Sequence, residues 1–155
     1  MTIKQLIVIS GPTASGKTSL SVALAKQFNS CVLSADSRQF YKEVSIGTAK
    51  PTEEEMDGIP HYFIDSHHLE DEVSAAQFER QALALLEELF QQHDLIILTG
   101  GSGMFVDALC NGLDDIPTSR ALRDELQKEA DSGGLENLLK ELKEKDPIYL
   151  SLIHI

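Results

Sequence analysis

The sequence predicts an α/β protein in which an open parallel sheet is flanked by helices. Short apolar, β-branched segments recur along the chain, and each is followed by a segment whose apolar residues have helical spacing. The first such pair is joined by residues 11–18, which fit the phosphate-binding pattern G-x-x-x-x-G-K-[ST]. The predicted sheet is therefore P-loop NTPase-like, and the beginning of an α-helical insertion is expected after it.

The phosphate loop lies between an expected strand, residues 6–10, and an expected helix, residues 19–28. Backbone N–H groups and the helix N-terminus would attract a phosphate there, and Lys17 adds a positive charge. The Thr18 hydroxyl is a candidate magnesium ligand. A turn that binds nothing is the alternative, but the flanking strand and helix favour a diphosphate or triphosphate site. The loop consists of Gly11, Pro12, Thr13, Ala14, Ser15, Gly16, Lys17 and Thr18.

Asp36 follows the second expected strand, residues 31–35. Ligands of open parallel sheets collect outside the carboxyl ends of the strands, which places this carboxylate near the phosphate loop. Asp36 could instead cap a following helical turn. We favour a functional role, and one residue can fill both roles.

Two further strands are expected, at residues 60–65 and 95–99, with a long amphipathic helix at residues 74–92 between them. The last strand ends in Gly100-Gly101-Ser102-Gly103. Small residues here either let the backbone approach a ligand or let a helix start in close packing, and the spacing does not decide between them.

The connecting loops offer a capping box and several polar side chains. Thr52 and Glu55 have the spacing of a capping box. Composition favours solvent over phosphate as the surroundings of Lys50. His61, His67 and His68 lack a cysteine or glutamate partner at metal-ligand spacing, so we interpret them as ordinary loop histidines.

We expect the α/β core to span residues 1–117 and to be followed by a helical region at 118–149. Apolar residues mark a helix near 122–130, a break at 132–134 and a second helix near 135–142.

The composition is that of a globular protein with 155 residues and a formal net charge of −12. The negative charge argues against a broad nucleic-acid surface, although not against a nucleic acid held at one local site. The sequence has no apolar stretch of about 18 residues, and its two cysteines, Cys31 and Cys110, do not suggest a disulfide framework. We expect a cytoplasmic monomer without membrane association.

The type of phosphate-loop protein depends on where the acids lie. A nucleotide hydrolase normally has a second acid at the end of an apolar strand, but residues 95–99 end in Thr-Gly-Gly. The nearby acid is Asp36, which suits a base that deprotonates an incoming nucleophile. A transferase is therefore favoured over a nucleotide switch.

Five ordered motifs resemble those of the tRNA dimethylallyltransferase (tRNA isopentenyltransferase) family. They are the phosphate loop, Asp36-Ser37-Arg38-Gln39-Phe40-Tyr41, Gly47-Thr48-Ala49-Lys50-Pro51, Pro60-His61-Tyr62 and Gly100-Gly101-Ser102-Gly103-Met104-Phe105. The resemblance extends from residue 7 to about residue 149. It implies that the loop holds dimethylallyl diphosphate and Mg²⁺, the latter through Thr18, and that the acceptor is the anticodon arm of tRNA.

The resemblance also implies the chemistry. The exocyclic amine of the adenosine 3′ to the anticodon, in tRNAs that read codons starting with U, would attack the prenyl group after that base is flipped out. Asp36 would take the amine proton, with Lys17 and Thr18 as the other catalytic residues. Asp36 would also contact tRNA, as would Ser37, Arg38, Gln39, Ser102 and Arg123.

The family continues well past the end of this chain with further core strands, so the resemblance implies an N-terminal fragment whose sheet lacks its C-terminal strands. It also implies that residues 118–149 begin the helical tRNA-binding insertion, whereas residues 150–155 do not match the family and are expected to be an atypical tail. We expect this fragment to be inactive or nearly inactive by itself. Three alternatives stay open. They are prenyl transfer to free adenosine phosphates by an adenylate isopentenyltransferase, phosphate transfer by a P-loop small-molecule kinase, and a non-catalytic nucleotide-binding module.

Overall fold

The computed structural model describes residues 3–114 and 119–152, which form two compact units, Met1–Leu113 and Asp114–Ile155. The predicted boundary between residues 117 and 118 lies outside the described residues, as does the end of the predicted tail at 153–155. Each unit is considered by itself. Within the described residues, no helix is long and apolar enough to cross a membrane.

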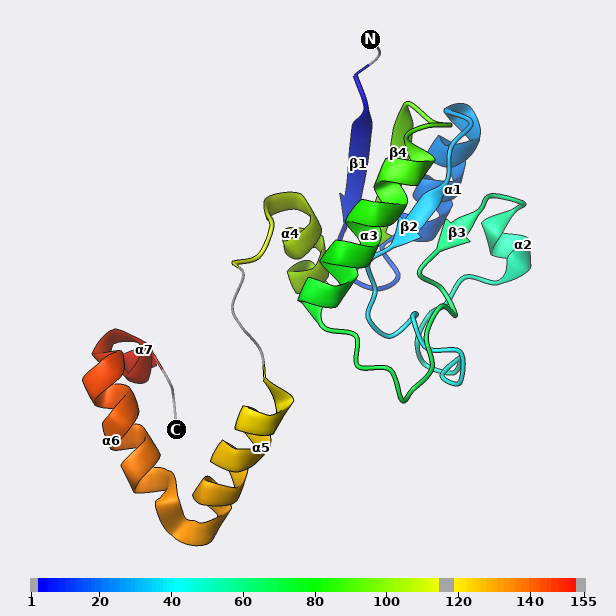
Figure 1. Ribbon diagram of the computed structural model, residues 1–155. Coiled ribbons are helices and arrows are strands. Elements are labelled where there is room, and N and C mark those ends of the chain that lie inside the picture. Colours follow the sequence, from blue (N-terminus) through cyan, green and yellow to red (C-terminus); the bar gives the residue numbers. More distant parts are fainter. Residues whose placement is uncertain (1–2, 115–118, 153–155) are drawn as a thin grey trace. The chain divides into compact units, whose positions relative to one another are not determined.

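The first unit contains a four-stranded, all-parallel sheet, as predicted (Figure 1). Its strands lie in the order β1-β4-β2-β3. They are β1 (Gln5–Ser10), β2 (Val32–Ser34), β3 (His61–Tyr62) and β4 (Leu95–Gly100).

The third strand is shorter than the predicted segment 60–65. Phe63 and Asp65 both have positive φ angles, of 62° and 50°, which take the backbone out of the extended conformation directly after Tyr62. The apolar run therefore continues into a tight connection instead of a longer strand.

The register brings the carboxyl ends of three strands together. Ser10 of β1 pairs with Gly100 of β4, and Ser34 of β2 pairs with Thr99 of β4. The segments that follow β1, β2 and β4 therefore all leave the sheet at one edge, where ligands of parallel sheets bind.

Helices cover both faces of the sheet (Figure 1). One face packs against α1 through Ala25, Val32 and Ile97. The opposite face carries Ile96 and Leu98 and is covered by α3 and α4. The helices of this unit are α1 (Lys17–Gln27), α2 (Glu53–Met56), α3 (Ala75–Leu89) and α4 (Gly103–Asn111).

Local signals explain where these helices begin. The predicted capping box of Thr52 and Glu55 starts α2, and Ser74 with Gln77 forms a second capping box at the start of α3. The first helix begins at Lys17, two residues before the predicted start, so the phosphate loop runs directly into it.

Cys31 is buried, Cys110 is exposed, and both thiols are free.

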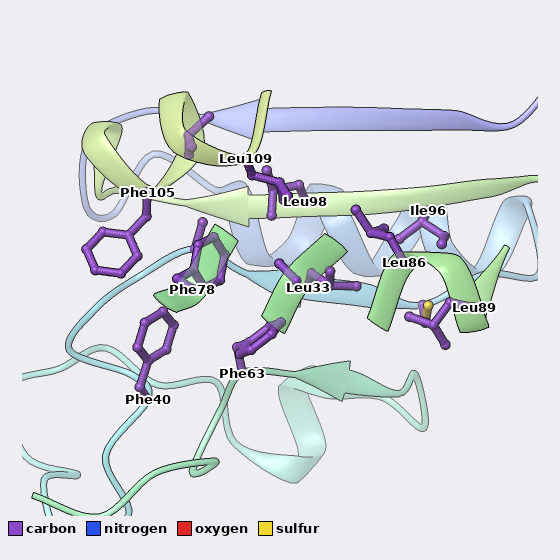
Figure 2. Close-up of a cluster of buried hydrophobic side chains, with 14 residues drawn as sticks. Leu33, Phe40, Phe63, Phe78, Leu86, Leu89, Ile96, Leu98, Phe105 and Leu109 are labelled. Atoms are coloured by element: carbon purple, nitrogen blue, oxygen red, sulfur yellow. The ribbon is translucent and has the colours of Figure 1, made fainter. Parts of the chain in front are cut away.

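An aromatic cluster anchors the chain beside the sheet edge (Figure 2). Phe40 and Phe78 are fully buried and stack with ring centroids 5.5 Å apart, and Phe105 lies edge-on to both rings. Phe40 follows the Asp36 segment and Phe105 lies in the first turn of α4. The core thus fixes two loop segments at the carboxyl edge of the sheet.

The second unit is helical and contains α5 (Arg120–Glu129), the π-helical turn η1 (Ala130–Gly134), α6 (Leu135–Lys145) and α7 (Pro147–Leu152). The predicted break occurs at η1, where Gly133 has a φ angle of 93°. A further helix follows the break at Asp146, because Pro147 suits a first helical position and the Asp146 carboxylate accepts a hydrogen bond from the Tyr149 N–H at 2.8 Å.

Candidate functional site

The phosphate loop connects β1 to α1 in a conformation that leaves its amides available. Ala14 and Gly16 have positive φ angles of 63° and 84°. Gly16 is the N-cap of α1, and no side chain caps that helix. The first N–H groups of α1 therefore lack a side-chain acceptor, which is the arrangement that binds an anion at a helix N-terminus.

The side chains of Lys17 and Thr18, at the end of the loop, line the same cavity. The Lys17 ammonium donates a hydrogen bond to the Pro12 carbonyl at 2.7 Å, so it is folded back across the loop. Lys17 and Thr18 are half-buried, and both line a cavity of about 960 Å³. The loop thus offers a charge, a hydroxyl and backbone donors to one ligand.

The two glycines that end β4 have different roles. A Cβ atom added to Gly100 would come within 2.5 Å of the Ala35 backbone, so β4 and β2 can approach each other only with glycine there. A Cβ atom on Gly101 would lie 3.7 Å from both the Asp36 Oδ2 atom and the Gly11 carbonyl oxygen. The turn therefore serves close packing at Gly100 and the cavity wall at Gly101.

Asp36 uses its two carboxylate oxygens differently. Oδ1 accepts a hydrogen bond from the Arg38 N–H at 3.1 Å, and the Asp36 carbonyl accepts one from the Gln39 N–H at 2.9 Å. Asp36 therefore caps the turn that follows β2. In the part of the chain that the structure describes, Oδ2 accepts no hydrogen bond, and the residue lines the cavity beside Gly101.

Two of the other residues predicted to contact tRNA, Ser37 and Gln39, form hydrogen bonds with neighbouring residues. Ser102 accepts a hydrogen bond from the Ser37 N–H at 3.2 Å, and the two hydroxyls lie 3.3 Å apart. The Gln39 amide is used within the protein, because it accepts from the Ser34 hydroxyl at 2.9 Å and donates to the Ala49 carbonyl at 3.0 Å. Arg38 is exposed at the cavity wall.

The cavity brings together most of the residues singled out from the sequence. It is lined by Thr13, Ala14, Gly16, Lys17, Thr18, Asp36, Ser37, Arg38, Gln39 and Ser102, among others. The predicted residues that do not line the cavity are Gly11, Pro12 and Ser15 of the phosphate loop, and Arg123, which is exposed on α5 in the second unit.

The expectation for Lys50 was wrong. Its side chain is only 8% exposed and forms an ion pair with Asp65 at 2.6 Å, and its ammonium also donates to the Tyr41 carbonyl. The partners are brought to it by the left-handed turn around Phe63 and Asp65, which local composition does not reveal. Lys50 also lines the cavity and adds a buried positive charge to its wall.

His61 is a cavity residue that the sequence pattern did not distinguish from the other histidines. Its Nδ1–H donates to the Ile59 carbonyl at 2.8 Å, which leaves Nε2 as an acceptor. This Nε2 atom is buried and finds no partner among the described residues. Burial lowers the pKa of the His61 imidazole, an effect that the bond to Ile59 partly offsets.

No group of three or more histidine, cysteine, aspartate or glutamate residues within residues 3–114 and 119–152 has the arrangement of a metal site. The Thr18 hydroxyl is an oxygen donor that lines the cavity beside the phosphate loop, and Mg²⁺ takes such a hydroxyl as a ligand. A magnesium ion that takes most of its ligands from a bound diphosphate and from water fits this set of donors.

Comparison with known proteins identifies the family. The family model of IPP transferase matches residues 39–155. A tRNA dimethylallyltransferase of Cytophaga hutchinsonii is 54% identical over 145 residues, which cover 93% of this chain and 48% of that protein. tRNA dimethylallyltransferase 1 of Bacteroides fragilis is 50% identical and aligns with 100% of this chain and 52% of its own length.

Solved structures agree with this match. The full-length tRNA isopentenylpyrophosphate transferase of Bacillus halodurans is 40% identical, with a TM-score of 0.69 over 97% of this chain and 50% of its own. A eukaryotic dimethylallyltransferase crystallised while acting on tRNA is 29% identical, with a TM-score of 0.81 over 97% of this chain and 38% of its own. The chain spans about half the length of the curated relatives it matches. Because the family model covers most of its residues, this chain belongs to the IPP transferase family.

Proposed function

We propose that this chain is the phosphate-binding part of an enzyme that prenylates tRNA. The donor is dimethylallyl diphosphate, and the acceptor is the exocyclic amine of the adenosine 3′ to the anticodon in tRNAs that read codons starting with U. The observation that carries the proposal is the meeting of the phosphate loop, the Asp36 carboxylate and Gly101 at one cavity wall. A diphosphate leaving group and a base are needed side by side in this reaction.

The residues of the chain have distinct roles in this reaction. The amine nitrogen forms a bond to the first carbon of the prenyl group as the bond from that carbon to the diphosphate oxygen breaks. Asp36 takes the proton that the amine releases, through the free Oδ2 atom. Lys17 and the loop amides stabilise the negative charge on the departing pyrophosphate. The reaction products are isopentenyladenosine in tRNA and pyrophosphate.

Magnesium and tRNA complete the proposal. Thr18 would hold Mg²⁺ together with the diphosphate, and the ion would offset phosphate charge when bound. Ser37, Arg38, Gln39 and Ser102 would form the tRNA-facing wall, and Arg123 would contact the anticodon arm from the second unit. The names of the relatives support a tRNA acceptor, since they are tRNA dimethylallyltransferases. We further propose a cytoplasmic monomer.

The test is a reaction of a full-length protein containing this chain with dimethylallyl diphosphate, Mg²⁺ and unmodified tRNA, followed by nucleoside mass spectrometry. We expect isopentenyladenosine only in tRNAs that read codons starting with U. Competition between AMP and tRNA separates this function from an adenylate isopentenyltransferase. Phosphate transfer from ATP in the absence of a prenyl donor would instead indicate a kinase, and the absence of any transfer would indicate a binding module.

A further inference from the structure

A second hollow, of about 480 Å³, adjoins the main cavity within the first unit. Its lining residues are Ser37, Arg38, Tyr41, Val44, Ile46, Gly47 and Thr48. Four of them also line the main cavity, namely Ser37, Arg38, Gly47 and Thr48. The two spaces therefore share a wall, which includes Ser37 and Arg38, two residues expected to contact the tRNA.

Ile46 lies at this hollow on a loop whose conformation is held by hydrogen bonds. Its side chain is 97% exposed. The hydroxyl of the buried Thr48 donates to the Ser45 carbonyl at 3.0 Å, and the Gln39 amide holds the Ala49 carbonyl at 3.0 Å. Gly47 supplies the positive φ angle, 78°, that the turn requires. The exposure of Ile46 is thus a consequence of a built turn.

The backbone at Tyr41, another residue of the hollow, is also fixed. The buried Lys50 ammonium donates to the Tyr41 carbonyl and pairs with Asp65, so the backbone at Tyr41 is tied to the wall of the main cavity. A single exposed apolar residue is ordinary on a protein surface. Here, however, the exposed isoleucine shares a hollow with Tyr41, Val44 and Arg38.

An aromatic ring, a branched aliphatic side chain and a guanidinium together suit a flat ring with an uncharged face. Proteins that bind single-stranded RNA use such surfaces to stack bases, and arginine can also pair with the adjoining phosphate. A base next to a flipped nucleotide is connected to it by one phosphodiester and must lie close by. The shared wall places the hollow where that neighbouring base would come.

We infer that this hollow, the Tyr41–Ile46 subsite, takes a nucleobase adjacent in the RNA strand to the reacting adenosine. The inference rests on the proposed function, because it needs an adenosine at Asp36. Since stacking surfaces tolerate every base, the subsite contributes to acceptor affinity more than to sequence choice.

The test uses a full-length protein containing this chain and three anticodon stem-loop RNAs. One RNA is intact, and the other two are abasic at the nucleotide 5′ or 3′ of the reacting adenosine. Ile46→Ala should lower kcat/KM on the intact RNA by about tenfold, mainly through KM, because the variant removes branched apolar surface that the base would cover. On one of the abasic RNAs the wild type should lose a similar factor, and the variant should then match the wild type.

Leu83→Ala is the matched control, because Leu83 is also an exposed aliphatic residue, on α3, and lines neither space. It should behave as the wild type on all three RNAs. Wild-type rates for Ile46→Ala on intact RNA would overturn the inference while the proposed function stands. An equal loss on all three RNAs would also overturn it, because the effect would not depend on a base. If the wild type prenylates none of the RNAs, the proposed function itself fails and the subsite with it.

Discussion

Asp36 combines an observed structural contact with a proposed role as a base. Oδ1 closes the turn after β2 by accepting the Arg38 N–H, while Oδ2 lies near Gly101 at the cavity wall. An asparagine can keep the first contact but cannot act as a base. The two roles can therefore be separated by one substitution.

We expect Asp36→Asn to lower kcat by about a hundredfold to ten-thousandfold, the usual loss for removal of a general base, with little change in affinity for pyrophosphate. Single-turnover kinetics and a pyrophosphate titration measure the two quantities. Asp107→Asn, at an exposed carboxylate on α4, should retain wild-type kinetics. Undiminished turnover by Asp36→Asn would remove this residue from the mechanism.

His61 predicts a pH dependence of folding stability. Burial lowers the pKa of its imidazole in the folded state, so below the unfolded value of about 6.5 the unfolded chain binds more protons at this residue. The contribution of the neutral His61 to the free energy of unfolding is therefore fully present above about pH 6.5 and is lost as the pH falls through the lowered folded pKa.

Urea unfolding of the wild type and of His61→Gln at about pH 7.5 and about pH 5.5 measures this contribution. The wild type should lose more stability than the variant between the two conditions. At the higher pH, the difference in the free energy of unfolding between the two proteins reports packing alone. The contribution of His61 titration is therefore the change in this difference between the two pH values. Equal losses in both proteins would show that His61 does not titrate with folding.

Some residues of the candidate site could be predicted from the sequence and others could not. The loop and Asp36 were predictable because spacing within a few residues places them at the carboxyl edge of a parallel sheet. Lys50 was not, because its burial depends on Asp65, which is fifteen residues away and is positioned by left-handed backbone turns. The unpartnered nitrogen of His61 likewise results from tertiary packing.

At the scale of elements, the site depends on how closely β2 and β4 approach each other. Gly100 lies against the Ala35 backbone, so any side chain at position 100 pushes the two strand ends apart. Gly103, three residues later, begins α4, and a Cβ atom there would meet nothing within 4 Å. The same substitution at these two positions should therefore have opposite effects.

We expect Gly100→Ala to reduce the free energy of unfolding by about 1–3 kcal/mol or more, through steric overlap, and to weaken pyrophosphate binding. Gly103→Ala should leave stability unchanged or raise it by about 0.5–1 kcal/mol, because alanine suits a helix better than glycine. Thermal and urea unfolding measure both. A Gly100→Ala variant as stable as the wild type would contradict the packing role assigned to this glycine.

Elements were predictable to different degrees for physical reasons. Strands buried on both faces and a helix with a capping box carry their own signals, as in Leu95–Gly100 and Ala75–Leu89. The third strand was predicted too long because the β-like sequence continues through Phe63. Phe63 has a positive φ angle, and its ring packs against Phe40 and Phe78, which are distant in the sequence. The helix α7 was missed because Asp146-Pro147 signals both an end and a beginning.

At the scale of the whole molecule, the net charge and the length of the chain affect the proposed binding of the prenyl donor and of the tRNA differently. The proposed donor site lies in the first unit, where the loop amides and Lys17 supply local positive potential. The net charge of the chain is −12, which opposes contact with the phosphates of an RNA over a wide surface. The relatives it matches are about twice its length.

We therefore expect residues 1–155 alone to bind pyrophosphate but to show no measurable prenyl transfer to tRNA. Calorimetric titration should detect pyrophosphate binding that Lys17→Met abolishes, whereas Lys26→Met, on the same helix but in an exposed ion pair with Asp57, should keep it. A full-length protein containing this chain should transfer the prenyl group under the same conditions. Turnover by residues 1–155 would contradict this expectation. It would show that this chain alone binds the tRNA, and that the positive potential at the cavity outweighs the net negative charge.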